Sequence, residues 1–346
     1  MKEPLVSILT PAYNAEKWIA DAINSALRQK WPRKEIIVVD DGSSDRTLSV
    51  ASKFSKEGVK VVSQQNRGAS AARNHAYSLS RGDYIQWLDA DDVLAPDKVS
   101  RQMEFAETAK NPYLLLSSEW GRFLYRTKRA EFIPTPLWED LLPLEWLLRK
   151  MTLNVWMQPG TWLTSRELTD AAGPWDERLS FDDDGEYFCR VITKSQGVAF
   201  VRGARIFYRA SGPGSLSTVD YSNKKLESAW LSIRMHIQYL RQLEISERTR
   251  SAAIGFLQTW ISMFDPYRTD IIDQMHEMAG ALGGKAGCLN RYLDLVEPLR
   301  WKFAWMGGVF GDRFAYWAQK SLPQFKHSVI HSAVRFWDRT LFQLGH

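Results

Sequence analysis

The sequence predicts an α/β protein with a mostly parallel sheet flanked by helices, followed by a helical C-terminal extension. Apolar runs of strand length alternate with helix-like segments at Leu5–Leu9, Glu35–Val39, Val59–Val62 and Tyr84–Leu88. This alternation is typical of βαβ units, whose strands form a parallel sheet. From Lys224 onward the apolar periodicity is helical. The chain therefore combines an α/β body with a helical segment behind it.

Helical periodicity defines the segments between the strands. The first of them places its apolar side chains on one helix face, and the second opens with Ser and Asp residues that suit an N-cap. The predicted helices of the α/β part are Ala15–Gln29, Ser44–Phe54, Gly68–Leu79 and Asp97–Ala109. Residues 110–165 are less regular and contain five prolines at intervals. The later predicted helices are Lys224–Leu243, Ser246–Phe264, Ile271–Leu282 and two segments after Leu299.

Each of the four predicted strands is followed by a polar cluster. The clusters are Thr10–Asn14, Asp40–Asp45, Asn66–Ala69 and Asp89–Asp92. Open α/β sheets bind their ligands at the carboxyl ends of the strands. The sequence therefore predicts one polar site that is assembled from four consecutive turns between a strand and a helix.

Length, composition and cysteine content restrict the class of protein. With 346 residues, 45% hydrophobic and 25% charged, the chain exceeds a typical domain of ~100–200 residues and has an ordinary globular composition. The two cysteines, Cys189 and Cys288, lie outside any C-x-x-C spacing, which argues against a disulfide framework and a zinc site. The N-terminus has no apolar signal core, and no uncharged apolar run reaches the ~18 residues that span a bilayer. These features predict a cytoplasmic protein.

Three carboxylates follow the fourth strand, at Asp89, Asp91 and Asp92. Carboxylates this close repel one another unless a cation lies between them. Mg²⁺ binds through one or two carboxylates together with substrate phosphates, which suits this turn. A calcium EF-hand is excluded, because positions six and twelve of a loop that starts at Asp89 are Leu94 and Ser100. The cluster predicts a divalent metal in a phosphate-binding site.

A second acidic cluster, Asp182-Asp183-Asp184-Gly185-Glu186, precedes the helix-like segment Tyr187–Ile192. Acids at a helix N-terminus stabilise the helix through its dipole, so a structural role explains them. A carboxylate beside a ligand site can also act as a general base, which takes a proton from the attacking group. The residues alone leave both interpretations open.

Two other nucleotide-binding classes are excluded by their defining loops. A dinucleotide-binding fold needs G-x-G-x-x-G after its first strand, where this chain has Thr10-Pro11-Ala12-Tyr13-Asn14-Ala15. A P-loop needs G-x-x-x-x-G-K-[ST], which does not occur in the sequence. Neither an oxidoreductase of the dinucleotide-binding type nor a P-loop hydrolase fits.

Taken in order over about residues 4–215, these motifs resemble glycosyltransferase family 2. The resemblance depends on the D-x-D run Asp89–Asp91, the turn Gly173–Glu177 and an acidic pair whose second member, Asp184, lies six residues before Arg190. It implies a GT-A (Rossmann-like) fold and an inverting, metal-dependent transferase. Such an enzyme moves a sugar from a nucleoside-diphosphate sugar, most often a UDP-sugar, to an acceptor hydroxyl.

The resemblance also implies a division of the chain. The GT-A catalytic domain is expected at residues 1–222, with a nucleotide-binding half at about 1–110 and an acceptor half at about 111–222. The helical extension is expected at residues 223–346. Its last part, about 299–346, is the basic and aromatic-rich tail described below.

Individual residues receive roles by the same resemblance. Asp184 is the expected general base, Asp91 the ligand of Mg²⁺ or Mn²⁺, and Asp89 the residue at the ribose. Residues expected to contact the nucleobase or the diphosphate are Pro11, Tyr13, Asp41, Arg73 and Arg209. Residues expected on the acceptor side are Asp183 and Trp162. Two positions depart from the family pattern, because Asp183 stands where Glu is commoner and the His that usually follows Tyr208-Arg209 is missing.

The formal net charge of +5 is concentrated in residues 299–346, which hold seven Lys or Arg, two Asp and eleven aromatic residues. Basic residues interleaved with large aromatic ones suit an anionic membrane surface. The last predicted helix is amphipathic, so the protein's own core or a homodimer partner are alternative locations for its apolar face. We expect peripheral association with the cytosolic face of a membrane, and no nucleic-acid binding.

The sequence specifies neither the sugar nor the acceptor. A carbohydrate or lipid-linked acceptor in cell-surface glycan, lipopolysaccharide or exopolysaccharide synthesis is the expectation. The alternative function is a non-catalytic protein on the same fold, which binds a nucleotide sugar or serves as a membrane-associated scaffold. Retention of Asp41, Asp91 and Asp184 together favours the enzyme.

Overall fold

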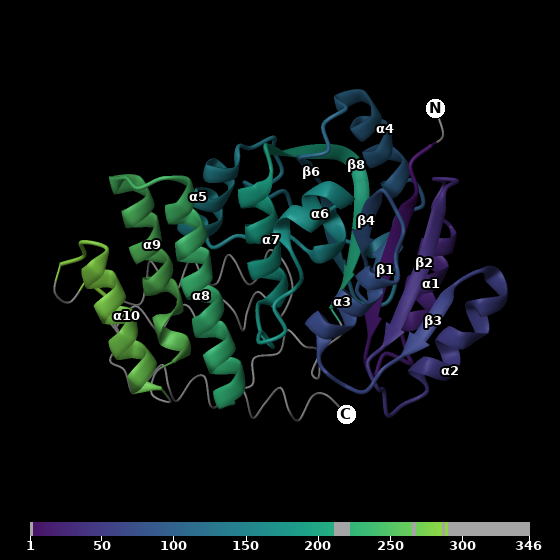
Figure 1. Cartoon of the computed structure of the whole chain (residues 1–346), viewed down its shortest axis with the longest axis horizontal. Helices are drawn as coiled ribbons and strands as arrows, with labels where there is room; N and C mark the ends of the chain where they lie inside the picture. The colour runs from purple at the N-terminus through teal and green to yellow at the C-terminus, as the bar shows by residue number, and fades with distance from the viewer. Residues whose placement is uncertain (1–2, 211–221, 265–267, 286–287, 290–346) are drawn as a thin grey trace. The chain divides into compact units, whose positions relative to one another are not determined.

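The computed structural model describes residues 3–210, 222–264, 268–285 and 288–289 (Figure 1). By its internal contacts the chain forms two compact units, of which the larger comprises residues up to Thr259 together with Ala281–Gly283. The site residues discussed below all belong to this larger unit. The tail at residues 299–346, with its two predicted helices, lies outside the described residues.

The first sheet has five strands in the order β3-β2-β1-β4-β7. The strands are β1 (Val6–Ala12), β2 (Lys34–Asp40), β3 (Lys60–Ser63), β4 (Tyr84–Trp87) and β7 (Thr164–Ser165). The first four are parallel, as predicted, and β7 pairs antiparallel with β4. β1 continues three residues further than predicted, because Thr10, Pro11 and Ala12 remain in register with Val38, Val39 and Asp40 of β2.

Strand order determines where a ligand can bind. β1 lies between β2 and β4. The chain passes from β1 to β2 and β3 on one side and then returns to place β4 on the other side of β1. The turns after β1, β2 and β4 therefore meet at one edge of the sheet, and this topological switch point is where open α/β sheets bind ligands. Three of the four predicted polar clusters follow these strands.

Helices cover the sheet as the periodicity predicts. The helices of this part are α1 (Ile19–Leu27), α2 (Thr47–Ser52), α3 (Ala69–Ser78) and α4 (Lys98–Ala109). The second predicted helix is interrupted, because α2 passes into a 3₁₀ turn at Lys53–Glu57 that ends at Gly58 in a left-handed conformation. The buried core gathers apolar side chains of α1 and α4 with those of β1 and β2, including Ile8, Ile19 and Val99.

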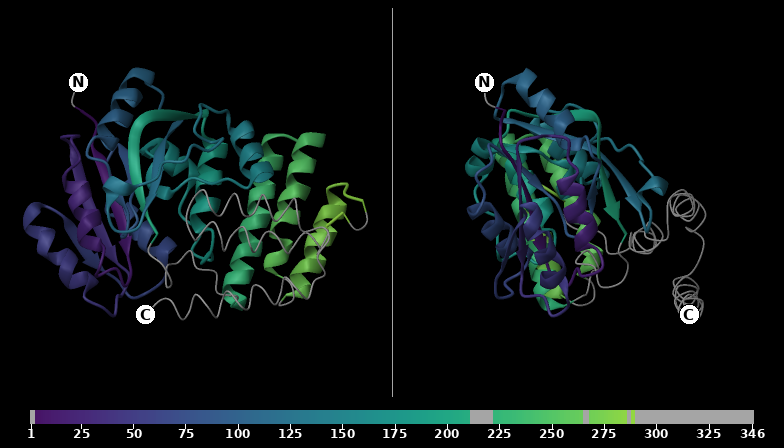
Figure 2. Two further views of the ribbon diagram at one scale, coloured as in Figure 1. Left: turned by 180° about the vertical axis from the view of Figure 1, so that it is seen from behind. Right: turned by 90° about the vertical axis from the view of Figure 1, so that its right-hand side faces the viewer.

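A second sheet has the order β5-β8-β6. Its strands are β5 (Val93–Leu94), β6 (Leu114–Phe123) and β8 (Gly197–Arg209), and the view from behind shows β8 as a long curved strand (Figure 2). β5 directly follows the Asp89–Asp92 turn and pairs with the end of β8, so this pairing brings Arg209 to the acidic turn. The irregular segment 110–165 contains η2 (Thr127–Arg129), α5 (Pro143–Leu153) and η3 (Pro159–Thr161).

The remaining helices of the larger unit are α6 (Arg166–Ala172), α7 (Asp183–Lys194), α8 (Asn223–Leu243) and α9 (Glu247–Trp260). α8 packs against α7 and α5, and α7 and α8 lie side by side in Figure 1. The other unit contains η4 (Ile261–Met263) and most of α10 (Thr269–Ala281). Among the described helices, none combines the length and the apolar character that a membrane crossing requires. The predicted division at residue 222 stays a prediction.

Candidate active site

Arg73 joins the two acidic clusters. It lies on α3, is only 5% exposed, and donates hydrogen bonds to Asp89 Oδ1 (2.9 Å) and Asp183 Oδ2 (2.6 Å). Burial opposes its charge, but the carboxylates of Asp183 and Asp89 raise the pKa of Arg73 further above its usual range. The structure therefore brings together a turn of the first sheet and the start of α7, which are far apart in the sequence.

The turn Gly173–Glu177 supplies the platform on which Arg73 rests. The guanidinium carbon lies 4.3 Å from the centre of the Trp175 ring, a cation–π contact. Trp175 also stacks on Tyr187 (3.9 Å between ring centres, 7° between planes) and contacts Trp87 edge-on (5.2 Å between ring centres). The motif named above for its resemblance thus has a physical role in orienting Arg73.

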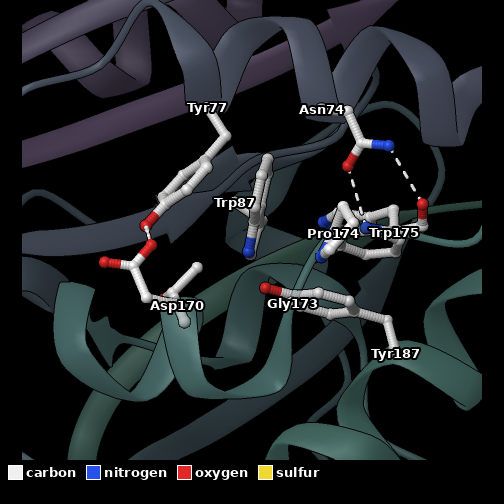
Figure 3. A pocket seen from close by; sticks show the side chains of 9 residues that line it. Asn74, Tyr77, Trp87, Asp170, Gly173, Pro174, Trp175 and Tyr187 are labelled. Atoms are coloured by element: carbon white, nitrogen blue, oxygen red, sulfur yellow. Dashed lines mark hydrogen bonds between the residues drawn. The ribbon is translucent and has the colours of Figure 1, made fainter.

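Asn74 fixes this platform to α3. Its side-chain amide donates to the Trp175 carbonyl (2.9 Å) and accepts from the Trp175 N–H (2.8 Å), as Figure 3 shows. Behind Trp175 lies a cavity of about 200 Å³, bordered by Trp87, Tyr187 and the hydrogen-bonded pair Tyr77–Asp170. Sequence reasoning missed Asn74, although it directly follows Arg73.

Asp41, the expected nucleobase reader, closes the loop that leads into α3. It is 2% exposed; its Oδ1 accepts from Gln64 Nε2 (2.7 Å) and the Arg67 N–H (3.0 Å), and its Oδ2 accepts from the Gly68 N–H (2.8 Å). A carboxylate oxygen can accept two hydrogen bonds, so Oδ2 keeps capacity for one further donor. Its role toward a base stays a prediction.

Gly42 allows the turn after β2 to approach the loop at Gln64–Asn66 closely. Its φ of +70° is left-handed, and a Cβ atom would lie 2.8 Å from the backbone nitrogen of Asn66. Only glycine fits both requirements. The turn after β1 is tied to the same place, because Asn14 accepts from the Ser44 N–H (2.9 Å) and donates its own N–H to Ser43 Oγ (3.0 Å).

Tyr13 is the aromatic residue that this turn presents. Its side chain is 48% exposed, whereas the neighbouring Pro11 is half-buried and pairs with Val39 in the sheet. An exposed ring at the carboxyl edge of the sheet has a free face for stacking. The structure thus places Tyr13 as the resemblance implies, and its contact with a base stays a prediction.

Arg209 holds the Asp89–Asp92 turn from the second sheet. Its N–H donates to Asp92 Oδ1 (2.9 Å), its Nε donates to the Asp91 carbonyl (2.7 Å), and a terminal nitrogen donates to Asp21 Oδ2 (2.8 Å). The guanidinium also lies between the rings of Trp18 (4.4 Å) and Phe123 (4.5 Å). In this structure Arg209 therefore braces the acidic turn, and contact with a diphosphate stays a prediction.

Asp92 is the buried member of the acidic turn. Burial, followed by the nearby carboxylates of Asp91 and Asp89, raises the pKa of Asp92 well above its usual range. Within the described chain its Oδ2 has no hydrogen-bond partner. The Asp92 carboxyl is thus buried beside two like-charged groups, the arrangement that the sequence predicts for this turn.

The carboxylates of the Asp89–Asp92 turn suit a metal ion that is bound jointly by the protein and a phosphate ligand, and not one that is enclosed by protein ligands alone. The described part of the chain holds no group of three Asp, Glu, His or Cys side chains placed around one ion. Mg²⁺ does not require such a cage, since it binds through one or two carboxylates and completes its shell with phosphate and water oxygens. Asp91, with Asp89 beside it, is compatible with that mode of binding.

Asp183 and Asp184 stand at the start of α7 in different environments. Asp183 is paired with Arg73 and lies 3.4 Å from Ser70 Oγ. The Asp184 side chain makes no hydrogen bond or ion pair with any described residue. Burial, and next the Asp183 and Asp182 carboxylates, raise the pKa of Asp184 to about 7, which is suited to a general base at neutral pH. The geometry therefore favours Asp184 over Asp183 for proton transfer.

Arg190 is not the partner of Asp184. It donates to both carboxylate oxygens of Glu186 (2.7 and 3.0 Å) and to the Ala172 carbonyl (2.5 Å). Glu186 also accepts from the Tyr239 hydroxyl (2.5 Å). Arg190 and Glu186 therefore connect α7 to α6 and α8, and the six-residue spacing from Asp184 to Arg190 corresponds to no contact between these two side chains.

The expectation for Trp162 requires correction. Its side chain is 1% exposed and stacks on Phe188 (5.2 Å), so it is a core residue with no face open to an acceptor. The nearby Trp156 is 39% exposed and stacks on Trp120 (4.9 Å). Sequence reasoning could not separate the two, because neither lies in a regular amphipathic element.

The fold and the acidic site together define the GT-A class of α/β proteins. Residues 7–139 match the family model described as Glycosyl transferase family 2.

Two similar proteins are described as glycosyltransferases. The putative teichuronic acid biosynthesis glycosyltransferase TuaG of Bacillus subtilis is 42% identical over 106 residues, which are 30% of this chain and 42% of that protein. The uncharacterized glycosyltransferase EpsJ of the same organism is 29% identical over 226 residues, 63% and 64% of the two chains. The chain spans less than two thirds of the length of either relative.

Among solved structures, S. aureus TarS 1–349 in complex with UDP-GlcNAc is similar with a TM-score of 0.64 and 16% identity, over 93% of each chain. At this identity the similarity concerns the fold alone.

Proposed function

We propose that this protein is an inverting glycosyltransferase that moves a sugar from a UDP-sugar to an acceptor hydroxyl. The observation that carries the proposal is the bridge of Arg73 between Asp89 and Asp183, because it places the unpaired Asp184 beside the acidic turn. The family match and the UDP-GlcNAc complex of the structurally similar TarS support a nucleotide-sugar donor.

In this reaction the Asp184 carboxylate takes the proton of the acceptor hydroxyl as the oxygen attacks the anomeric carbon. The bond from that carbon to the diphosphate breaks on the opposite side, and the UDP leaves with the bonding electron pair. Asp41 and Tyr13 would hold the base, with Pro11 beside them, and Asp89 the ribose. Arg209 would contribute by holding the turn that bears Asp91.

Mg²⁺ or Mn²⁺ held by Asp91 would stabilise the negative charge that develops on the leaving diphosphate. Arg73 adds a fixed positive charge next to the same carboxylates. Asp183 is held in an ion pair with that arginine, so we assign it to orientation of the acceptor side instead of proton transfer.

We further propose that the acceptor is a carbohydrate or a lipid-linked glycan of a cell-surface polysaccharide. The relative TuaG is described as a teichuronic acid biosynthesis enzyme, which supports a role of this kind. We also propose that the protein is cytoplasmic and binds the cytosolic face of the membrane through residues 299–346, where its positive charge is concentrated. The GT-A fold itself would end near residue 222, and the helical extension would follow.

A panel of nucleotide sugars tests the proposal. Purified protein with Mn²⁺ is incubated with UDP-, GDP-, CDP- and dTDP-sugars, and release of the nucleoside diphosphate and the melting temperature are measured. Stabilisation and turnover with one or more UDP-sugars are expected. Stabilisation without any turnover, also in the presence of acceptor oligosaccharides, would favour the non-catalytic binding protein.

A further inference from the structure

α8 carries a row of buried polar side chains. Ser228, Ser232 and His236 are four residues apart and therefore lie on one face of the helix, and Tyr239 continues the row. All four are buried. Buried polar groups persist where they are hydrogen-bonded, so the partners of this row indicate what it is for.

Ser228 binds the backbone just before α7. Its hydroxyl accepts from the N–H groups of Ser180 (2.8 Å) and Phe181 (2.9 Å) and donates to the Phe181 carbonyl (3.0 Å). One side chain thus satisfies three backbone groups of a segment that has no regular structure of its own. This segment leads directly into the acidic cluster.

Ser232 and His236 bind the first residue of that cluster. The Ser232 hydroxyl donates to Asp182 Oδ2 (2.6 Å). His236 Nδ1 lies 2.7 Å from the Ser232 carbonyl, which can only accept, and 3.7 Å from Asp182 Oδ2. Nδ1 therefore carries the hydrogen, and the ring fixes Ser232 in turn.

Asp182 itself has an unusual conformation. Its backbone φ is 56°, in the left-handed region that residues other than glycine rarely adopt. Such a conformation is kept only where surrounding contacts hold it. As the N-cap of α7 it makes no side-chain bond to the helix, although this is what an N-cap Asp usually does. A Cβ at Gly185 would lie 2.0 Å from Asp182 Oδ1, so Gly185 leaves the space that this side chain occupies.

From these contacts we infer that α8 is the positioning element of the catalytic base. Ser232 binds Asp182 directly, Ser228 holds the two residues before it, and His236 fixes Ser232. Asp182 in turn sets the position of Asp183 and Asp184, which follow it. The identity of the base rests on the function proposed above, whereas the contacts of α8 do not. The part of the chain needed for catalysis then extends at least through α8, beyond the boundary predicted at residue 222.

Ser232→Ala in the full chain tests this inference. Because a misplacement of ~1 Å can cost ~10²-fold in rate, we expect kcat for UDP-sugar turnover to fall by about tenfold or more, with KM for the donor within about twofold. Ser117→Ala is the matched control, since Ser117 is equally buried but its hydroxyl reaches only the Ala199 carbonyl at 3.4 Å. The control should keep wild-type kinetics.

Two variants of Asp182 show whether Ser232 acts through it. Asp182→Asn keeps an oxygen acceptor for Ser232 and should retain several-fold more activity than Asp182→Ala. The double variant S232A/D182A should be no slower than Asp182→Ala alone, because both substitutions remove the same hydrogen bond between Ser232 and Asp182. Independent losses that multiply would overturn the inference.

Hydrogen exchange separates this inference from the identity of the base. Ser232→Ala should speed amide exchange in a peptide that covers residues 180–186 and leave α3 (Ala69–Ser78) unchanged. If exchange is faster there while Asp184→Asn remains active, the positioning contact is supported and the assignment of Asp184 fails. Unchanged exchange at 180–186, or equal acceleration in α3, would contradict the inference.

Discussion

Asp183 and Asp184 are adjacent in the chain, yet the Arg73 guanidinium donates to Asp183 Oδ2 at 2.6 Å and makes no hydrogen bond to Asp184. The Asp183 carboxylate is thus held in an ion pair with a buried arginine. Its neighbour, half-buried and next to like charges, has a raised pKa and no partner in the described chain. A pair of neighbouring carboxylates, one held by an arginine and the other with a raised pKa, is typical of proton-transfer sites.

The pH dependence of turnover follows from the raised pKa of Asp184. A base must be ionised, and the Asp184 carboxyl, with a pKa of about 7, is protonated below that pH. We therefore expect kcat/KM to fall about tenfold per pH unit on the acid side of pH 7. Asp182→Asn removes one of the negative charges that raise this pKa, so its acid limb should move to lower pH. An acid limb near pH 4 in the wild type would contradict the assignment.

The bridge by Arg73 requires a planar fork. In Arg73→Lys a single ammonium group cannot bind Asp89 and Asp183 in the same geometry, so we expect kcat/KM to fall by ~10²-fold and stability by about 1–3 kcal/mol. Arg67→Lys is the control, because its pair with Glu177 (2.7 Å) is exposed and contributes less than about 1 kcal/mol. Steady-state kinetics and urea unfolding measure both quantities. Equal behaviour of the two variants would show that the bridge is dispensable.

Metal dependence should be traceable to Asp91. Excess chelator is expected to abolish turnover, and Mg²⁺ or Mn²⁺ to restore it. Asp91→Asn should weaken UDP binding by about tenfold or more with metal present and change it little without metal, which calorimetry can resolve. Full turnover in excess EDTA would exclude the role given to Asp91, and the fold assignment would stand.

The basic tail is expected to bind anionic membranes. Each Lys or Arg near the surface contributes ~1 kcal/mol, so the full chain should sediment with anionic vesicles at low salt and less at high salt. A chain that ends at Glu297 should remain in the supernatant, and neutral vesicles serve as the control. Equal partitioning of the two proteins would instead indicate that the apolar side chains of the tail pack within the protein or a dimer.

Local patterns were sufficient to predict four of the five strands of the first sheet. The alternation of apolar runs and helical segments predicted β1 to β4 within a few residues, because short buried parallel strands are almost wholly apolar. The limits of β1 were less accurate, since Pro11 and Ala12 stay in the sheet through pairing with β2, a tertiary effect. β8, with 13 residues, was not predicted, because charged and polar residues interrupt its second half.

The sequence indicated which residue types form the site, but it did not indicate which residues they contact. Asp184 was identified by its distance from Arg190, although Arg190 pairs with Glu186. The bridge by Arg73 depends on how α3 and α7 pack, which no local pattern reports. The row Ser228, Ser232 and His236 did have a sequence signal, namely polar residues four apart among the apolar positions of a helix, and it was not recognised.

Turnover by Asp184→Asn, compared with Asp183→Asn, tests the central claim most directly. Both variants remove one negative charge from the start of α7, so they are matched, and each is assayed for UDP release and for UDP affinity. Asp184→Asn should lower kcat by ~10²-fold or more with UDP affinity nearly unchanged, while Asp183→Asn should retain more of its turnover. Near wild-type kcat for Asp184→Asn with an inactive Asp183→Asn would contradict this account.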